Sequence, residues 1–425
     1  MTVGKEGDGL AARAPGPHPE PGVSLRGTFV ALSYPNYRRW FLGQLVSLVG
    51  TWMQTTAQGF LVFELTRSPA YLGYVGFAAG IPSWLFMLYG GVVADRIPRR
   101  TLLLATQTSM MLLAFVLAGL TFTHLIQPWH IVALAFGLGV PNAFDAPARQ
   151  AFVLEMVDRS ALVNAIALNS IMFNTATAVG PAAAGIAYAL FGPAWCFTLN
   201  GVSFLAVIVA LLGMRLRTAR GARRETSAFD DLREGIRFVL GEARVRTIIG
   251  LIAVTSLFGL AFSPLTPAWA VTVFHGDART NGLLLSARGI GSVLGALLIA
   301  VLGQMAPRGI LLTVGSFAFP AFVLVFAVVR WLPLGLLVLV GVGWGFMVLA
   351  NTANVLIQTL IPDALRGRVM GLYTLTFFGF MPIGALLAGG LAEWVGEPAT
   401  VAFGALVSLL AAGALWVWMP ALHRL

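Results

Sequence analysis

The stretch AYLGYVGFAAGIPSWLFMLYGGVVADRIPRR, residues 70–100, contains the pattern that decides the fold. Its first part, 70–94, carries no charged side chain. At a rise of about 1.5 Å per residue, a helix of this length crosses the roughly 30 Å hydrocarbon core of a bilayer. Asp95 and three arginines follow directly. An apolar run that ends in a short basic segment is typical of a membrane-spanning helix and the loop after it.

The composition of the whole chain extends this pattern. Of 425 residues, 58% are hydrophobic and 10% are charged, and the mean hydropathy is +0.85, whereas about a quarter of the residues of a soluble domain are charged. A water-soluble fold is therefore excluded. The single cysteine, Cys196, lies in an apolar run, so we expect no disulfide, no metal site and no cofactor. The net charge of +10 does not indicate nucleic-acid binding, because the arginines lie in short segments between apolar runs.

Apolar stretches long enough to span a bilayer recur along nearly the whole sequence. Six lie before a charged segment and six lie after it, at 37–64, 70–94, 101–123, 129–150, 163–190, 194–214, 247–273, 280–304, 309–329, 333–360, 367–391 and 399–419. The sequence thus predicts an all-α integral membrane protein with twelve transmembrane helices in two pseudo-symmetric six-helix bundles. The predicted divisions are a disordered cytoplasmic tail at 1–33, a bundle at 34–214, a cytoplasmic linker at 215–246, a second bundle at 247–420 and a cytoplasmic C-terminus at 421–425.

The distribution of arginine predicts the orientation, because basic residues favour the cytoplasmic side of short loops. With the N-terminus inside, most arginines fall in inner segments, and Arg67, Arg279 and Arg330 remain in outer loops. We therefore expect both termini and the linker to be cytoplasmic in a multi-pass protein of a bacterial-type inner membrane.

The segment GVVADRIPRR follows the second span and begins at Gly91. Gly91 permits close helix approach, and Asp95 can accept hydrogen bonds from the free N–H groups of a neighbouring helix N-terminus. By itself such a segment can be an ordinary basic turn. In a twelve-helix frame it resembles the loop motif of the major facilitator superfamily, in which glycine is followed by Asp-Arg, here Asp95 and Arg96, and by paired basic residues, here Arg99 and Arg100. The resemblance implies that fold, with repeated halves meeting at a midplane site.

Further elements resemble exporters of the same superfamily. The sequence GPAAAG runs from Gly180 to Gly185, where Pro181 removes a backbone hydrogen bond and the glycines permit a tight, kinked interface. The segments NAFDAPARQ, 142–150, and LRGRVMG, 365–371, resemble the transmembrane secretion effector branch, which includes enterobactin-type exporters.

The resemblance also implies an inner latch. We expect Asp95 to cap the eleventh helix and Asp145 to pair with Arg99, and we expect this latch to break in the inward-open state. Asp145 lies four residues before Arg149, on the same face of the fourth helix. The corresponding loop of the second half, 303–308, is a degenerate copy of the first-half motif, which predicts asymmetric latching.

Polar residues inside apolar helices are costly in lipid and show which face is shielded. In the first helix they recur every three or four residues, and shorter rows occur in the fifth and tenth helices. We expect these faces to line a central substrate-binding cavity, with two tryptophans adding aromatic surface; the alternative is hydrogen bonding between helices without substrate contact. The residues concerned are Gln44, Ser47, Thr51, Trp52, Gln54, Thr55, Gln58, Ser170, Asn174, Thr177, Trp344, Asn351, Asn354 and Gln358.

Charged residues within the spans are few. Arg288 lies about eight residues into the eighth helix, roughly 12 Å from its outer boundary. It is the candidate for binding an anionic group by paired hydrogen bonds, and a structural pairing role is the alternative. No Asp or Glu is expected at mid-membrane, so Glu64, at the outer end of the first helix, and Asp145 are the candidates for carrying a proton.

The sequence contains no Walker loop, no Ser-His-Asp set and no zinc-ligand spacing, so enzymatic activity is not expected. It predicts a monomeric secondary transporter that exports a hydrophobic or amphipathic compound, such as a drug or siderophore, by alternating access. Its expected partners are the lipid bilayer, the small-molecule substrate and H⁺ as the coupling ion. Two alternatives stay open: uptake of a nutrient by the same fold, and a non-transporting sensor or scaffold whose basic linker binds a partner or anionic lipid.

Overall fold

The computed structural model describes residues 29–214, 228–302 and 307–419, with only the backbone described at 87–96, 228–232, 300 and 302. Within these ranges the chain is helical and contains no strand. The expected tail up to residue 28, most of the degenerate 303–308 loop and the C-terminus from 420 lie outside the described residues.

The first six long helices follow one another closely. They are α2 (Pro35–Thr66), α3 (Pro69–Arg96), α4 (Arg99–Phe122), α5 (Pro128–Phe152), α6 (Leu162–Phe191) and α7 (Pro193–Leu212). Four of them begin with proline, whose missing N–H and fixed φ suit the first helical turn. The short 3-10 helices of this half are η1 (Val30–Ser33), η2 (Val153–Glu155) and η3 (Arg159–Ala161).

The second six spans follow the linker helix α8 (Ala228–Gly241). The seventh is assembled from α9 (Ala243–Val254), a π-helical turn η4 (Thr255–Gly259), a 3-10 segment η5 (Leu260–Leu265) and α10 (Thr266–Thr272). Pro264 lies in the 3-10 segment, and proline cannot donate to a helical ladder. The others are α11 (Ala278–Leu302), α12 (Arg308–Val328), α13 (Leu332–Leu360), α14 (Arg366–Val395) and α15 (Glu397–Trp418), with η6 (Asp363–Leu365) before α14.

Ten helical stretches of the described chain are long and apolar enough to cross a membrane. The helices α2 and α3 are not among these ten. In α2, the polar side chains of Gln44, Gln54 and Gln58 lower the hydropathy. Large exposed tryptophans, including Trp129 and Trp331, mark one end of the bundle, as expected at a membrane–water interface.

The two halves repeat the same local devices. The fifth and sixth spans are joined by Gly192 alone, with φ +86°, and the eleventh and twelfth by Gly396 alone, with φ +81°. Glycine adopts this backbone conformation without the steric cost of a Cβ. Pro98 and Pro307 cap the third and ninth spans with almost the same backbone angles. The structure is therefore a twelve-helix membrane protein made of two pseudo-symmetric bundles.

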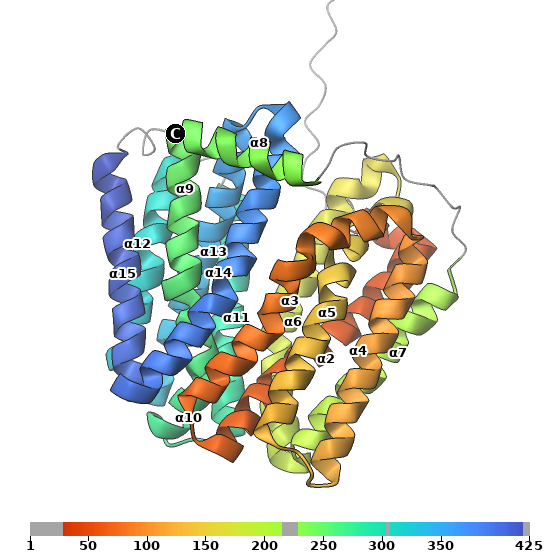
Figure 1. Ribbon diagram of the computed structural model, residues 1–425, viewed down its shortest axis with the longest axis vertical. Coiled ribbons are helices and arrows are strands. Elements are labelled where there is room, and N and C mark those ends of the chain that lie inside the picture. Colours follow the sequence, from red (N-terminus) through yellow and green to blue (C-terminus); the bar gives the residue numbers. More distant parts are fainter. Residues whose placement is uncertain (1–28, 215–227, 303–306, 420–425) are drawn as a thin grey trace, which may run out of the picture.

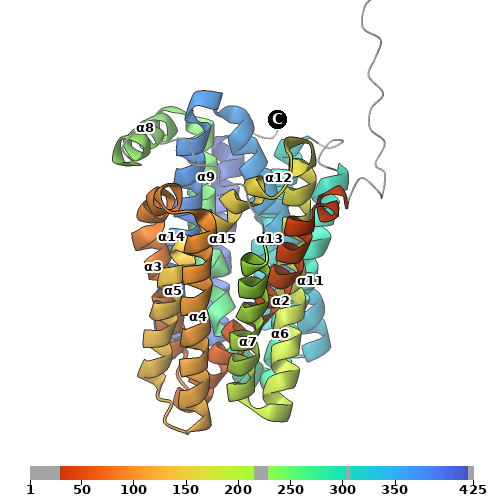
Figure 2. The same cartoon turned by 90° about the vertical axis from the view of Figure 1, so that its right-hand side faces the viewer.

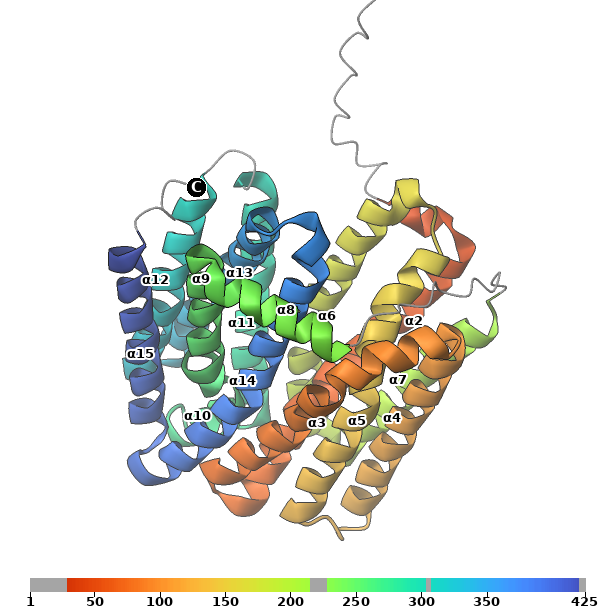
Figure 3. The same ribbon diagram turned by 45° about the horizontal axis from the view of Figure 1, so that its top comes forward.

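The two bundles lie side by side, and the helices between them are α3 with α14 and α6 with α11 (Figures 1 and 3). We call these two contacts the seam. The linker helix α8 crosses one end of the long helices (Figure 2), and we call this the α8 end and the opposite one the α10 end.

Three boundaries differ from the sequence-based expectation. Residues 30–33 of the expected tail form η1, in which Ala31 is fully buried and its N–H donates to Asn164 Oδ1 at 2.9 Å. The expected linker contains a regular amphipathic helix, α8, whose Gly235 and Val239 are buried against the second half. The seventh span begins at Ala243, earlier than the expected 247, because Glu242 caps its first turn by accepting from Arg244 N–H.

Candidate functional site at the seam

Glycine makes the α3–α14 part of the seam unusually close. A Cβ on Gly389 would lie 2.7 Å from the Cα of Gly73, and one on Gly80 would lie 2.2 Å from the ring of Pro382. At midspan, a Cβ on Gly379 of α14 would lie 2.4 Å from the indole ring of Trp84 of α3. These contacts extend from the middle of both helices to the α10 end.

The α6–α11 part of the seam contains the exporter-like Gly-Pro element. A Cβ on Gly282 would lie 2.4 Å from the carbonyl oxygen of Pro181, and one on Gly185 would lie 2.9 Å from that of Ala278. Gly180 instead seats α6 against α2 of its own half, because a Cβ there would meet the Cβ of Trp52 at 2.5 Å. The element thus serves one contact within a half and one between the halves.

At the α10 end, polar bonds join the two halves. Glu393 of α14 accepts from Ser68 Oγ at 2.7 Å and from Ala70 N–H at 3.2 Å. At the α8 end, two arginines of α4 bind within the first half: Arg99 pairs with Glu155 at 2.8 Å, and Arg100 donates to the carbonyl of Leu212 at 2.9 Å.

The polar row of α2 is divided between two environments. Thr51 and Thr55 are exposed, and Trp52 is half-buried with an edge-to-face contact to Phe173 of α6. The rest of the row is buried inside its own bundle, where Gln54 Oε1 accepts from Asn200 at 2.7 Å and Gln58 donates to the carbonyl of Ile131 at 3.3 Å. The residues buried in this way are Gln44, Ser47, Gln54 and Gln58. In this conformation these four side chains do not line a central cavity, because they are buried against other helices of the first half.

The rows of α6 and α13 are more accessible. Ser170 and Gln358 are exposed, and Gln358 donates to Asn354 Oδ1 at 2.7 Å within α13. The remaining members are half-buried: Asn174, Thr177, Trp344, Asn351 and Asn354. Polar side chains in lipid are costly, so accessible polar groups at midspan indicate faces turned away from lipid.

Arg288 is the charged residue of α11 beside the midspan seam. It is half-buried, and its Nη1 donates to Ser263 Oγ at 2.5 Å. Ser263 belongs to the 3-10 segment of the discontinuous seventh span, and the next residue on α11, Gly289, packs against the Thr177 carbonyl of α6. Among the described residues no carboxylate lies within 4.0 Å of Arg288. Its guanidinium thus keeps unused donors near the meeting point of the two halves.

Asp145 forms a buried network within the first half, and the expected pairing with Arg99 is not formed. The carboxylate accepts from Thr106 Oγ1 and Gln107 Nε2, both at 2.9 Å, and lies 3.8 Å from Arg149. Arg99 pairs with Glu155 instead, because the chain turns into η2 directly after α5 and brings that carboxylate beside the start of α4.

The remaining expected site residues fall into two groups. Gly91, Asp95 and Arg96 end α3, but their side chains lie outside the described residues, so the predicted cap on the eleventh helix stays a prediction. Glu64 is exposed at the α10 end and accepts from the hydroxyl of Tyr188 within the first half.

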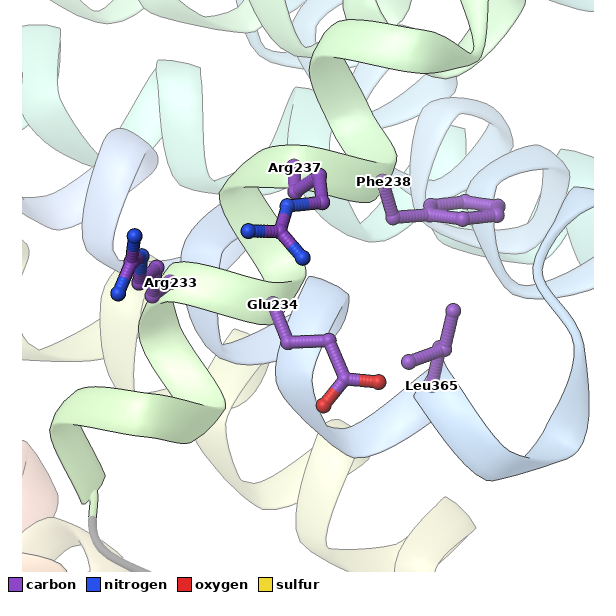
Figure 4. Close-up of a pocket in the computed structure, with 5 residues that line it drawn as sticks. All are labelled: Arg233, Glu234, Arg237, Phe238 and Leu365. Carbon is purple, nitrogen blue, oxygen red and sulfur yellow. The ribbon is translucent and has the colours of Figure 1, made fainter.

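A pocket of about 480 Å³ lies at the α8 end, apart from the seam, and its lining is shown in Figure 4. Arg233, Arg237 and Phe238 of α8 line it together with Leu365 of η6. Glu234 extends towards η6 and pairs with Arg368 at 2.6 Å. This ion pair ties the linker helix to α14 of the second half.

Sequence reasoning missed the irregular seventh span and the polar bond across the seam. The Pro264 and Pro267 pair was the available signal for the first. Glu393 carried none, because an exposed carboxylate near a helix end usually has no partner. Among the described residues, no group of three or more His, Cys, Asp or Glu side chains forms a metal site.

The comparisons with known proteins agree on one family. The family described as transmembrane secretion effector matches residues 26–423. The staphyloferrin A transporter of Staphylococcus aureus is 22% identical over 357 residues, which cover 84% of this chain and 89% of the relative. The enterobactin exporter EntS of Citrobacter koseri is 27% identical over 369 residues, which cover 84% and 86%.

Solved transporters share the fold at low sequence identity. The nucleoside transporter NupG superposes with a TM-score of 0.67 at 14% identity, covering 90% of this chain and 98% of NupG. A bacterial homologue of the lysosomal transporter Spinster gives a TM-score of 0.64 at 13% identity, covering 93% and 96%. The chain is a membrane transporter and not an enzyme, and it belongs to the transmembrane secretion effector family of the major facilitator superfamily.

Proposed function

We propose that this chain exports a hydrophobic or amphipathic small molecule, of drug or siderophore type, by alternating access driven by the proton gradient. The observation that carries the proposal is the seam, which is closely packed from midspan to the α10 end and is bridged there by the hydrogen bonds of Glu393. Two rigid halves in contact at one end provide the geometry for rocking around a central site.

We place the α8 end in the cytoplasm. The arginine-rich segments, including those around Arg99 and Arg368, lie at this end, and the positive-inside rule supports that orientation. The conformation described above is then closed towards the outside. Both termini are assigned to the cytoplasm by the same argument.

The substrate site is proposed at midspan between the halves. Thr51, Thr55 and Asn174 supply polar surface from the first half, and Asn351 and Arg288 supply it from the second. A guanidinium with free donors suits a substrate that carries a carboxylate or another anionic oxygen pair. The names of two relatives, a staphyloferrin A transporter and an enterobactin exporter, support the siderophore type.

Glu64 and Asp145 remain the candidates for proton coupling. Both are carboxylates with hydrogen-bond donors in the first half, at Tyr188 for Glu64 and at Thr106 and Gln107 for Asp145. Asp145 is the buried one, and a buried carboxylate that changes its protonation changes the local electrostatics most strongly.

The test is accumulation of dyes, antibiotics and siderophores in an efflux-deficient bacterium that expresses the chain. We expect lower accumulation of at least one compound, reversed by an uncoupler and by Arg288→Gln. The matched control is Arg244→Gln, because Arg244 is an exposed arginine at the α8 end. It should leave export unchanged.

Three other results would each exclude part of the proposal. Raised accumulation on expression would indicate uptake. Export that survives the uncoupler would exclude the proton gradient as the driving force. No change for any compound in the presence of verified, correctly inserted protein would favour the sensor or scaffold alternative.

A further inference from the structure

The last turn of α14 carries a carboxylate that crosses the seam. Glu393 Oε2 accepts from both Ser68 Oγ and Ala70 N–H. Ser68 directly precedes α3, whose first N–H groups have no partner within the helix and form the positive end of its dipole. A side chain of the second half therefore caps a helix of the first half.

Two other carboxylates at the α10 end, Asp277 and Glu64, bind within their own half. Asp277 Oδ1 caps α11 by accepting from Arg279 N–H at 2.9 Å and from Thr280 N–H at 3.2 Å. Glu64 accepts from Tyr188 of the same bundle. Asp277 and Glu393 thus each cap the N-terminus of a helix. The Glu393 cap breaks when the halves separate, and the Asp277 cap does not.

We propose that Glu393 is the lock of the α10 end, a contact that holds α14 on the N-terminus of α3 and must break each time this end opens. The inference rests on the alternating-access part of the proposed function. The predicted cap of Asp95 on the N-terminus of α14 lies at the opposite end of the same two helices. The helix pair would then carry one carboxylate cap at each end, pointing in opposite directions, and the two would form in alternate states.

The surroundings of Glu393 suit a contact that is made and broken repeatedly. Its side chain is exposed, so water replaces the lost partners when the halves part. One turn further into the seam, Gly73 and Gly389 bring the two backbones together, which keeps Glu393 next to the start of α3. A weak, solvent-accessible bond at the extremity of the seam biases the closed state without trapping it.

The experiment measures the opening of the α10 end directly. Spin labels are placed by Leu125→Cys in the first half and Trp331→Cys in the second, both exposed at this end, in a Cys196→Ala background. Distances between the labels are measured by pulsed electron paramagnetic resonance in lipid nanodiscs. Glu393→Ala should raise the ratio of long to short distances about fivefold, which is the size expected for the loss of one helix cap.

Two further variants separate the lock from general destabilisation. Ser68→Ala should raise the ratio less, because Ala70 N–H still binds Glu393. Asp277→Ala removes an equivalent cap within one half and should leave the ratio unchanged.

Two results would overturn the proposal, and they are distinguishable. If the wild-type chain shows both distances and Glu393→Ala does not change their ratio, the lock is wrong and alternating access stands. If the wild-type chain and every variant show a single distance with and without transported compound, alternating access itself is wrong.

Discussion

The two ends of α14 differ in how closely a glycine of each end packs against other residues. Near the α10 end, Gly389 is buried, and a Cβ there would meet the Cα of Gly73 at 2.7 Å. Near the α8 end, Gly371 is exposed, and a Cβ there would meet nothing within 4 Å. The same residue type therefore sits in a tight contact between the halves at one end and in open space at the other.

This difference shows where the described contacts hold the two halves together and where they hold each half together. At the α10 end, backbones touch and Glu393 bonds across the seam. At the α8 end, each half is stabilised from within, by the Asp145 network in the first half and by the Glu234–Arg368 pair in the second. A molecule of this kind can open one end without disrupting either bundle.

The largest expected effect comes from filling the glycine contact. Gly389→Leu should lower the free energy of unfolding by about 1–3 kcal/mol, because overpacking a tight contact forces backbone shifts. Gly371→Leu, in the same helix, should change it by less than about 0.5 kcal/mol, as surface substitutions usually do. Thermal unfolding of both purified variants in detergent measures the difference. Equal effects would remove the contrast between the two ends.

The second-largest effect concerns the Asp145 network, which we expect to stabilise the first half near the α8 end. Asp145→Asn should cost about 1–2 kcal/mol, because it turns two charge-assisted hydrogen bonds into neutral ones and replaces the oxygen that faces Arg149 by an amide NH2. Asp363→Asn, which removes an exposed carboxylate paired with Arg366, is the control. Chemical or thermal unfolding of the two variants is the measurement, and a cost for Asp145→Asn no larger than the control would show that the network is not structural.

The smallest effect concerns the linker helix. Arg368→Gln breaks the pair with Glu234, and partly exposed ion pairs contribute about 0.2–1 kcal/mol. We expect faster proteolysis or hydrogen exchange of α8 with an almost unchanged melting temperature. High salt should reduce the difference from the wild type. A large loss of global stability would mean that α8 supports the whole second half.

Much of the fold could be predicted from the sequence, because long apolar runs leave few alternatives in a membrane. The twelve spans, the family and the transporter class are confirmed. The break in the seventh span was missed because Pro264 and Pro267 lie in a run that is otherwise apolar throughout. Hydropathy indicates the length of a membrane span, but it does not indicate whether the helix is regular along that span.

The site was harder to predict than the fold. Periodicity correctly shows that Gln54 and Gln58 share a face with Thr51, but a polar face can turn towards a neighbouring helix as well as towards a cavity. Here Asn200 and the Ile131 carbonyl compete for these amides. Which partner a side chain takes therefore depends on packing between helices that are far apart in the sequence.

The turns at the α10 end have a practical consequence for handling the protein. Gly192 and Gly396 each join two long helices as single residues, and only Arg67 and Ser68 separate α2 from α3. Antibodies and proteases that approach from this side meet tight helix ends and almost no extended chain. The segments 123–127, between α4 and α5, and 273–277, between α10 and α11, are longer, so they are the natural places to insert an epitope tag on that face.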